Sequence, residues 1–569
     1  MRKIPYFLCF VAFVLLIVEY GFSWTQIKIM KFHIAELLLA LYFTFRYLLE
    51  GAREKFSKVY LKENIGETVF LSLFFLSIVL LSILLRNPIF HKSYSLLPHF
   101  TPCTPFFLPL QIFLSLEILL HVSDLPRLFV HLPLKPGQLV VTTYLSIIIL
   151  GTLLLSLPQA QNGGEISWLD RLFTASSATC VTGLTVVDIS QVFTPYGQSI
   201  ILLLIQIGGL GLVTFVTFFA LLMGKGMGFR ERAFLKDVLD YEVIGEMGRL
   251  VITILLVTFA LEGIGTLVLS RIFSHYPEEI PSPFFFGLFH SVSAFCNAGF
   301  SLFKDSLRGF KDSISINLTF GILIIIGGLG FLVIRDVLRF LIRRIRRKPC
   351  VLSLHTRLVL ITTGILLFSG FFGFMILLPL GIYSFKERTL ISFFQSVTAR
   401  TAGFSTIDIS TLPSPIQLLL IFLMFIGASP GSTGGGIKTS TFAVVLITVL
   451  SYLKGKERVE VFARTIPPLL VHRIIAIVSF SLFLVFFSTI LLTLTEDYPF
   501  LSLLFEAVSA FGTVGLSHGI TPYLSPWGKM TLIVTMLIGR IGPLTLALAM
   551  GPRVKRVTYK YPEERVLVG

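Results

Sequence analysis

The feature that most constrains this chain is a succession of uninterrupted apolar stretches, each of about 20 residues, which is long enough to cross a ~30 Å hydrocarbon layer as a helix. Composition agrees, because 54% of the 569 residues are apolar and only 14% are charged. In soluble domains about a quarter of the residues are charged. A soluble enzyme, a disordered chain and a collagen-like chain are therefore excluded, and we expect an all-α polytopic membrane protein.

Four apolar segments precede the regular part of the chain and predict four N-terminal transmembrane helices. They lie near residues 4–22, 33–49, 68–85 and 106–120. The first has a basic start like a secretory signal, but its apolar stretch is too long and no small-residue cleavage site follows, so we interpret it as a span. The five cysteines are dispersed and include no CxxC pair, which predicts neither a disulfide framework nor a zinc site.

From about residue 138 the chain repeats one pattern four times: a long apolar helix, a short semi-polar segment, a glycine and a second long apolar helix. The short segments start at Phe173, Phe289, Phe394 and Phe505 and end at Gly183, Gly299, Gly403 and Gly515. An Ile-Gly step then recurs in each second helix, at Gly208, Gly327, Gly427 and Gly539. The pattern predicts an N-terminal extension (residues 1–130) and four repeats, over 131–235, 236–350, 351–460 and 461–569, the last with a cytoplasmic tail.

Basic residues follow each second helix and predict which side of the membrane these loops face. The clusters comprise Lys225, Arg230, Arg232 and Lys236; seven residues from Arg335 to Lys348; Lys454, Lys456 and Arg458; and Arg553, Lys555 and Arg556. Cytoplasmic loops collect Lys and Arg, so all four clusters are expected in the cytoplasm and the short segments are expected to enter from outside. The same rule explains the net charge of +16 without a nucleic-acid partner.

The short segments have a physical consequence. Non-helical backbone at membrane depth is tolerated only where protein or a water-filled cavity surrounds it. Four equivalent entries in one chain therefore imply a common axis lined by their backbones, whose carbonyl oxygens replace the hydration shell of a cation. The short helices would direct their partially negative C-terminal ends toward this axis. The pattern predicts a cation-conducting pore with pseudo-fourfold symmetry.

Two features of the second helices stand out. The third repeat places five glycines and Pro430 within ten residues, which is incompatible with a straight helix. Its G-x-x-x-x-G spacing resembles a phosphate-binding loop, but Ile437 separates the last glycine from Lys438 and no strand precedes it, which disfavours nucleotide binding. Arg540 lies inside the last apolar helix, where a charge is costly, so it is either functional or paired with helix carbonyls.

At these residues the chain resembles a known family. From about residue 135 to 569 it is similar to the Trk/Ktr/HKT superfamily of potassium transporters, and most to the membrane subunit of bacterial Ktr systems. The resemblance rests on six strings in the family's order: ATCVTGLTVVD, FCNAGFS, RTAGFSTID, FGTVGL, GASPGSTGGGIKTST and GITPYLSPWGKMTLIVTMLIGRIGPLTLA. It covers about three quarters of the chain, and the strings together are far more specific than any one alone.

The resemblance implies roles for individual residues. Gly183, Gly299, Gly403 and Gly515 fall at the family's selectivity-filter glycines, and glycine at position 183 favours potassium over sodium. Arg540 would face the pore as an electrostatic barrier. Potassium would be bound by the carbonyls of Val181, Thr182, Asn297, Ala298, Thr401, Ala402, Thr513 and Val514. An intramembrane gating loop would comprise Gly427, Gly431, Gly434, Gly435, Gly436 and Lys438.

The resemblance also implies partners and location: a homodimer in the bacterial inner membrane, potassium uptake, and regulation by a cytoplasmic RCK-type nucleotide-binding ring. The basic segment from Arg335 to Lys348 would contact that ring or anionic membrane lipid, and its charge fits both. No cofactor is expected beyond the transported K⁺. The motifs leave open whether Na⁺, protons or the membrane potential alone drives transport.

The rival function is a secondary cation carrier of alternating-access type. It predicts inverted repeats, whereas the four repeats share one basic side. An enzyme is disfavoured because no catalytic or metal-ligand set recurs. Arg400 and Glu506 are expected to brace the filter scaffold. For three acidic residues near the outer ends of the filter segments, attraction of cations and ordinary loop charge remain equal alternatives: Asp170, Asp188 and Asp408.

Overall fold

The computed structural model describes most of the chain from residue 136 onward and part of the N-terminal extension. The described residues are 4–22, 26–53, 71–72, 110–111, 113–114, 136–163, 166–223, 247–277, 280–379, 381–543 and 545–546. The spans expected near 68–85 and 106–120 lie almost entirely outside them. The basic clusters from Lys225 to Lys236 and from Arg553 to Arg556 lie outside them completely.

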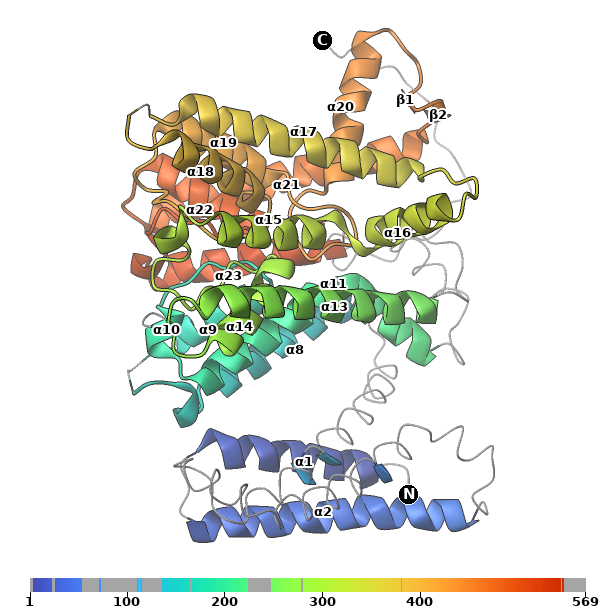
Figure 1. Ribbon diagram of the computed structural model, residues 1–569, viewed down its shortest axis with the longest axis vertical. Helices are drawn as coiled ribbons and strands as arrows, with labels where there is room; N and C mark the ends of the chain where they lie inside the picture. The colour runs from blue at the N-terminus through green and yellow to red at the C-terminus, as the bar shows by residue number, and fades with distance from the viewer. Residues whose placement is uncertain are drawn as a thin grey trace.

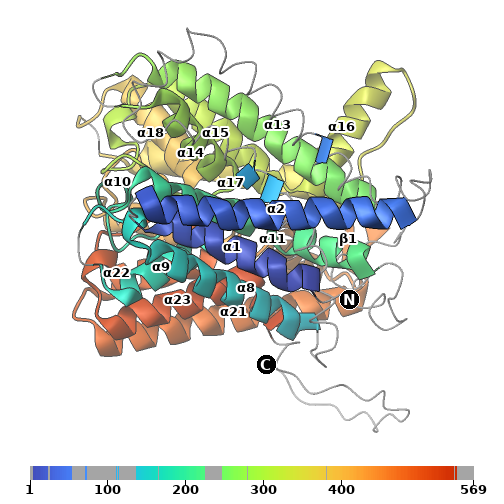
Figure 2. The same cartoon turned by 90° about the horizontal axis from the view of Figure 1, so that it is seen from below.

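The N-terminal extension contributes two helices, α1 (Ile4–Gly21) and α2 (Gln26–Arg53), which lie side by side (Figures 1 and 2). The second begins seven residues earlier than the span expected from residue 33. The turn after α1 contacts the segment that follows α8 (Pro136–Leu155), because Gln159 Nε2 donates a hydrogen bond of 3.0 Å to the Phe22 carbonyl. The hairpin is thus attached to the remainder of the protein at this turn.

From residue 136 the helices can be taken in four groups, each of which starts with a long helix followed by a short one (Figure 1). The first group comprises α8, α9 (Trp168–Thr179) and α11 (Pro195–Met223), and the second α13 (Met247–Phe273), α14 (Pro283–Phe295), α15 (Ile314–Leu329) and α16 (Phe331–Ile345). The third comprises α17 (Leu354–Leu377), α18 (Phe385–Thr398), α19 (Ser414–Phe425) and α20 (Thr439–Leu453), and the fourth α21 (Pro468–Thr495), α22 (Phe500–Gly512) and α23 (Pro526–Ile541).

Small elements complete the described residues. They are one short α-helix, α10 (Ile189–Val192); three 3₁₀ turns, η1 (Pro158–Ala160), η3 (Arg308–Phe310) and η4 (Thr521–Tyr523); and an antiparallel hairpin of β1 (Glu460–Val461) and β2 (Arg464–Thr465). In the hairpin, Glu460 pairs with Thr465 and Val461 with Arg464. The rest of the regular structure within the described residues is helical.

The short helices α9, α14, α18 and α22 are too short to cross a bilayer, and two of them begin at a capping side chain. Ser167 accepts a hydrogen bond from the Asp170 backbone at the start of α9, and Ser384 forms a reciprocal capping box with Glu387 at the start of α18. At 1.5 Å per residue, helices of this size extend about 20 Å, against ~30 Å for the hydrocarbon layer. They are buried among the longer helices.

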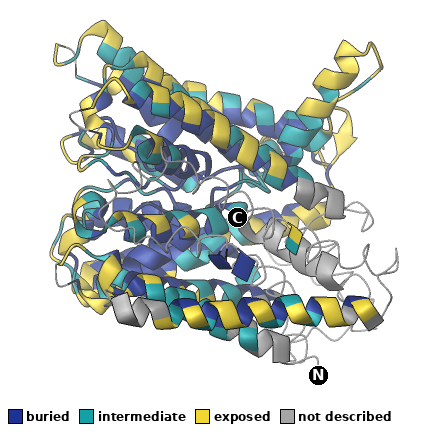
Figure 3. Cartoon of the chain, turned by 60° about the horizontal axis from the view of Figure 1, so that its bottom comes forward, coloured by how far each residue is buried: buried dark blue, intermediate teal, exposed yellow. Residues whose placement is uncertain are grey.

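The longer helices present apolar side chains outward. Leu267 of α13, Ile376 of α17 and Leu494 of α21 are 68%, 76% and 76% exposed, whereas Ser and Thr side chains gather in the interior. Figure 3 shows this distribution, with exposed positions along the outer helices and buried ones inside. Among the described residues, four stretches are long and apolar enough to span a membrane, namely Lys31–Leu49, Thr253–Phe273, Leu354–Leu377 and Pro468–Thr495, and the bent pair α15–α16 makes a fifth.

One prediction about the second repeat is wrong. The sequence predicts that the basic residues from Arg335 to Lys348 form a loop, but most of them belong to helix α16, which turns by 100° from α15. The bend is at Gly330, whose φ of 90° is accessible to glycine. Apolar residues at helical spacing explain the helix, because Leu338, Leu341 and Ile345 make an exposed apolar stripe beside the arginines.

Candidate functional site

Backbone conformation marks the four short segments as equivalent. Each of the four glycines expected to form the filter, Gly183, Gly299, Gly403 and Gly515, has a positive φ, between 71° and 93°. The residue two positions earlier is also left-handed in every segment: Val181, Asn297, Thr401 and Thr513 have φ of 57°, 58°, 73° and 49°. All four are completely buried, and three are β-branched, for which this conformation is a strained outlier. Strain of this kind persists only where the surrounding structure imposes it, and it clusters at functional sites.

The four glycines form a closed ring. A Cβ built on Gly183 would lie 3.0 Å from the Gly299 Cα, and one on Gly299 would lie 3.1 Å from the Gly403 Cα. The contacts continue from Gly403 to the Gly515 Cα at 3.1 Å and from Gly515 back to the Gly183 Cα at 3.0 Å. Each added Cβ would also meet the carbonyl oxygen of the residue before the next glycine. Any side chain at these positions would therefore obstruct the ring.

A hydroxyl near the end of each short helix anchors the strand that carries the glycine. In the first and fourth segments, Ser177 Oγ and Ser509 Oγ accept hydrogen bonds from the N–H of Gly183 and Gly515, both at 3.1 Å. In the second and third segments the hydroxyl donates instead, to carbonyls one residue beyond the glycine, from Ser293 to Phe300 (2.8 Å) and from Thr398 to Phe404 (2.7 Å). The recurring Ser or Thr of the sequence pattern thus has a structural role.

The Ile-Gly steps of the second helices bring backbones into contact. A Cβ on Gly208, Gly327 or Gly539 would lie 2.8–3.0 Å from the carbonyl carbon of a residue at the end of a short helix, namely Thr179, Phe295 and Phe511. Glycine is required there because the second helix packs directly on the end of the short helix. In the third repeat, a Cβ on Gly427 would instead meet the backbone of Gly435, within the same glycine-rich segment.

That glycine-rich segment interrupts the second helix of the third repeat, as the sequence predicts. Helix α19 ends at Phe425, and α20 begins at Thr439. The segment 426–438, hereafter the glycine-rich loop, lies against the strained residues beside the ring. The Gly435 N–H donates to Thr513 Oγ1 at 3.0 Å, and a Cβ on Gly434 would collide with Thr401 Oγ1.

Two cations hold the glycine-rich loop. The Arg540 guanidinium of α23 donates hydrogen bonds to the Thr433 carbonyl in the loop and to the Gly208 carbonyl of α11. Lys438 Nζ donates to the Gly434 carbonyl at 2.7 Å. Arg540 therefore joins the loop to α11 and α23. Of the two alternatives for this arginine, the structure shows the pairing with backbone carbonyls, one of which lies in the loop.

The loop also contacts the bend between α15 and α16. The Phe331 N–H, at the start of α16, donates to the Gly431 carbonyl at 2.9 Å, and the Ser429 N–H donates to the Gly328 carbonyl at 3.0 Å. Thr433 Oγ1 donates to the Gly327 carbonyl at 3.1 Å. The basic helix α16 is consequently connected to the loop through backbone hydrogen bonds.

The residues expected to brace the filter differ in their contacts. Glu506 of α22 is completely buried and accepts hydrogen bonds from Ser517 Oγ (2.6 Å), the His518 N–H (3.0 Å) and Thr521 Oγ1 (2.9 Å), so it fixes the segment after Gly515. The Nε of Arg400, which is also buried, has no hydrogen-bond partner among the described residues. The contacts of Glu506 are those of a residue that braces the segment after Gly515, whereas the Arg400 Nε has no contact that would brace it.

The three outer acidic residues have local partners, which favours the loop-charge alternative. Asp170 pairs with Lys529 at 2.7 Å, and Asp188 caps α10 through the Ser190 N–H at 2.9 Å. Asp408 pairs with Arg308 at 3.0 Å. Burial by itself raises the pKa of Asp408, but hydrogen bonds from Ser410 and the nearby guanidinium outweigh it, so the pKa lies below its ordinary value. Asp170 and Asp408 contribute little net field because each is paired with a cation, whereas Asp188 has only Ser190 as its partner.

Comparisons with known proteins agree with this architecture. The family described as TrkH, cation transport protein, matches residues 135–555. The Ktr system potassium uptake protein B of Bacillus subtilis (strain 168) is 40% identical over 442 residues, covering 76% of this chain and 97% of that protein. The potassium/sodium uptake protein NtpJ of Enterococcus hirae is 38% identical over 77% of this chain and 98% of its own length.

A solved structure extends the likeness to the fold. The crystal structure of the potassium transporter TrkH from Vibrio parahaemolyticus matches with a TM-score of 0.59 at 21% identity, covering 86% of this chain and 98% of that one. The family match and the apolar outer helices together identify a multi-pass membrane protein that is a transporter and not an enzyme. This chain belongs to the TrkH family of cation transport proteins.

Proposed function

We propose that this protein takes up potassium across a bacterial inner membrane through a pore with pseudo-fourfold symmetry. The observation that carries the proposal is the closed ring of four glycines, each with a left-handed residue two positions earlier. A ring of backbones without Cβ atoms suits the binding of a dehydrated cation by carbonyl oxygens. The Ktr proteins that this chain resembles are named for potassium uptake, which supports K⁺ as the ion.

In this proposal the ion is bound by the carbonyls of the two residues before each glycine. The four repeats divide the chain at 131–235, 236–350, 351–460 and 461–569, with the last boundary inside the β1–β2 hairpin, and residues 1–130 form a separate transmembrane extension. The strained conformations at Val181, Asn297, Thr401 and Thr513 support this assignment of the filter, since hydrogen bonds and packing must hold them against their own preferences.

The glycine-rich loop is the proposed gate. It lies against two of the strained residues, and Arg540 ties it to helices of two other repeats. A guanidinium beside the pathway opposes cation passage by electrostatic repulsion. Opening would require the loop to leave Thr513 and to break the hydrogen bond between the Thr433 carbonyl and Arg540.

A cytoplasmic regulator would act on this gate through α16. The helix begins one residue after Gly330, and its first N–H is bonded to the loop, so a movement of α16 pulls on the loop backbone. The relatives belong to Ktr systems, which supports a regulatory partner, here proposed as an RCK-type nucleotide-binding ring beneath a homodimer. Anionic lipid is the other partner suited to a helix with exposed arginines and leucines.

Rubidium uptake into proteoliposomes of the purified protein tests the proposal. In proteoliposomes with an outward K⁺ gradient and excess external Na⁺, we expect the tracer to accumulate. External K⁺ should abolish this accumulation, whereas external Na⁺ should not. An exchange strictly coupled one-for-one to a second ion, with a slow saturable rate, would instead establish the alternating-access carrier. If the wild type is silent, addition of an RCK-type subunit with nucleotide must restore the flux, and continued silence would refute the pore.

A further inference from the structure

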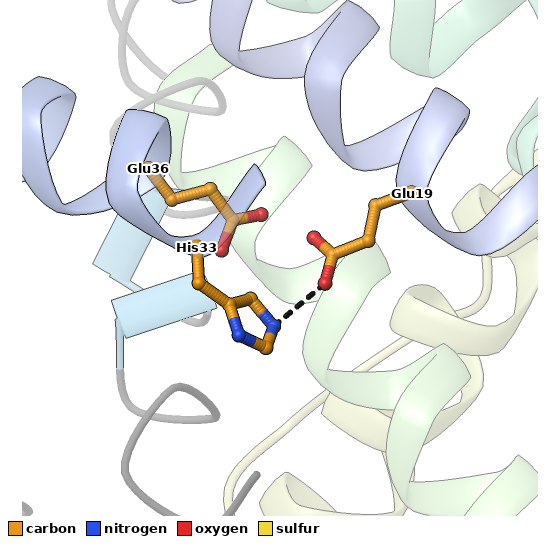
Figure 4. Close-up of side chains that lie close together, drawn as sticks. All are labelled: Glu19, His33 and Glu36. Carbon is orange, nitrogen blue, oxygen red and sulfur yellow. Dashed lines mark ion pairs between the residues drawn. The ribbon is translucent and has the colours of Figure 1, made fainter. Parts of the chain in front are cut away.

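The N-terminal hairpin contains a buried cluster of three metal-ligating side chains, away from the glycine ring. Glu19 comes from α1, and His33 and Glu36 come from one face of α2, since they are three residues apart. Figure 4 shows the three side chains converging between the two helices. Their nearest ligand atoms all lie within 4.8 Å of one another, and His33 Nε2 is 2.8 Å from Glu19 Oε1.

The cluster is buried, and one of its carboxylates, Glu36, has an oxygen without a hydrogen-bond partner among the described residues. His33 and Glu19 side chains are each 7% exposed, and Glu36 is not exposed at all. Glu36 Oε1 is a buried oxygen with no hydrogen-bond partner among the described residues. A buried carboxylate oxygen in this condition is costly, because the water it loses on burial is not replaced. The Glu36 carboxylate that carries this oxygen belongs to the group of side chains that converge in the cluster.

A second layer of side chains orients the carboxylates. Gln111 Nε2 donates to both Glu19 Oε2 and Glu36 Oε2, at 3.3 Å each, and the Tyr20 hydroxyl donates to Gln111 Oε1. Hydrogen bonds to the outer oxygens of ligating carboxylates are typical of metal sites, where they fix the ligand orientation. Two charged carboxylates in one buried cluster repel each other unless a positive charge lies between them.

We propose that Glu19, His33 and Glu36 bind one divalent transition-metal ion, with zinc as the best fit. One imidazole nitrogen with two carboxylate oxygens is a donor set that suits zinc, whereas Mg²⁺ and Ca²⁺ prefer oxygen ligands alone. A divalent ion neutralises the two carboxylates and provides Glu36 Oε1 with its partner. Donors around tetrahedral zinc are about 3.3 Å apart, so small side-chain rotations suffice to close the cluster. The site lies outside residues 135–555, the part matched by the family.

The test is zinc binding by the full-length protein in detergent, after removal of metals with a chelator. We expect one zinc ion per chain by elemental analysis, with Glu36→Gln and His33→Gln each weakening binding at least tenfold. Matched controls change the same residue types at exposed positions: Glu460→Gln, which breaks only a surface pair with Lys456, and His275→Gln. The controls must retain wild-type binding.

X-ray absorption at the zinc edge of the wild-type protein supplies a readout that does not depend on how the variants fold. The site predicts one imidazole and oxygen neighbours at about 2.0–2.2 Å, without the sulfur neighbours at about 2.3 Å that zinc bound to cysteine would give. Undiminished binding in Glu36→Gln, a sulfur shell, equal competition by Mg²⁺, or no binding by the wild type would each overturn the proposal.

Discussion

Replacement of Arg540 by alanine removes the contact that joins the glycine-rich loop to two other repeats. The guanidinium donates to two carbonyls, Thr433 in the loop and Gly208 in α11. Hydrogen bonds to a charged group contribute about 1.5–3 kcal/mol each. Opening of the loop breaks the bond to the Thr433 carbonyl, whereas Gly208 lies outside the loop, so the substitution destabilises the closed loop by about 1.5–3 kcal/mol. Since about 1.4 kcal/mol corresponds to a factor of ten, the ratio of open to closed loop rises by between about 10 and 10².

The assay is rubidium flux into proteoliposomes without any regulatory subunit, normalised to the amount of reconstituted protein. Arg540→Ala is expected to raise this basal flux until every loop is open, and Arg540→Lys to give a smaller rise, because one ammonium group cannot reproduce the planar fork of donors. Arg473→Ala, which removes an exposed arginine of α21, serves as the charge-matched control. Unchanged or reduced basal flux in well-folded Arg540→Ala would refute this account of the gate.

Three further predictions follow from the contacts. Gly327→Ala should lower the melting temperature in detergent, because the new Cβ would press on a short-helix carbonyl and destabilise the folded state by about 1–3 kcal/mol. The control Gly263→Ala has open space around it, so its folded state should be unchanged or more stable by up to about 1 kcal/mol. Equal shifts of the melting temperature in the two variants would contradict the close packing. Ser509→Ala should lower the K⁺ over Na⁺ permeability ratio, because the Gly515 N–H loses its hydrogen bond to the Ser509 hydroxyl. The control Ser199→Ala changes an exposed serine and should leave the ratio unchanged. The same ratio in both variants would contradict the anchoring role of Ser509. Phe331→Pro deletes the N–H that donates to the loop, and the first position of a helix tolerates proline. The flux without a regulatory subunit should therefore be higher in Phe331→Pro than in Phe331→Ala. Equal fluxes would argue against a connection through α16.

Much of the site could be predicted because its signals are local. A glycine with positive φ, a short helix and a glycine-rich break each depend on a few consecutive residues, and the recurrence of Gly183, Gly299, Gly403 and Gly515 revealed their equivalence. Arg540 was noticeable because a charge in an apolar helix is unusual. Its partners were not predictable in detail, since they come from two other repeats.

What the sequence did not reveal depends on tertiary contacts. Left-handed Val181, Thr401 and Thr513 contradict the preferences of β-branched residues, so no propensity points to them. The apolar spacing in 331–345 could have predicted α16, but the density of arginines there favoured a loop, and only the contacts at Gly330 explain the bend. The cluster in the N-terminal hairpin joins residues of two separate helices, and its separated positions give no motif of their own.

The most direct test of the central claim is the cation selectivity of Gly183→Ser, compared with the wild type and with Gly519→Ser in proteoliposomes under K⁺ and Na⁺ gradients. Both glycines have a positive φ, of 92° and 82°, but only Gly183 belongs to the ring, while Gly519 has open space around it. The account predicts potassium-selective flux for the wild type and for Gly519→Ser, and a loss of selectivity for Gly183→Ser. Selectivity that is the same in all three proteins would contradict a filter made by the four glycines.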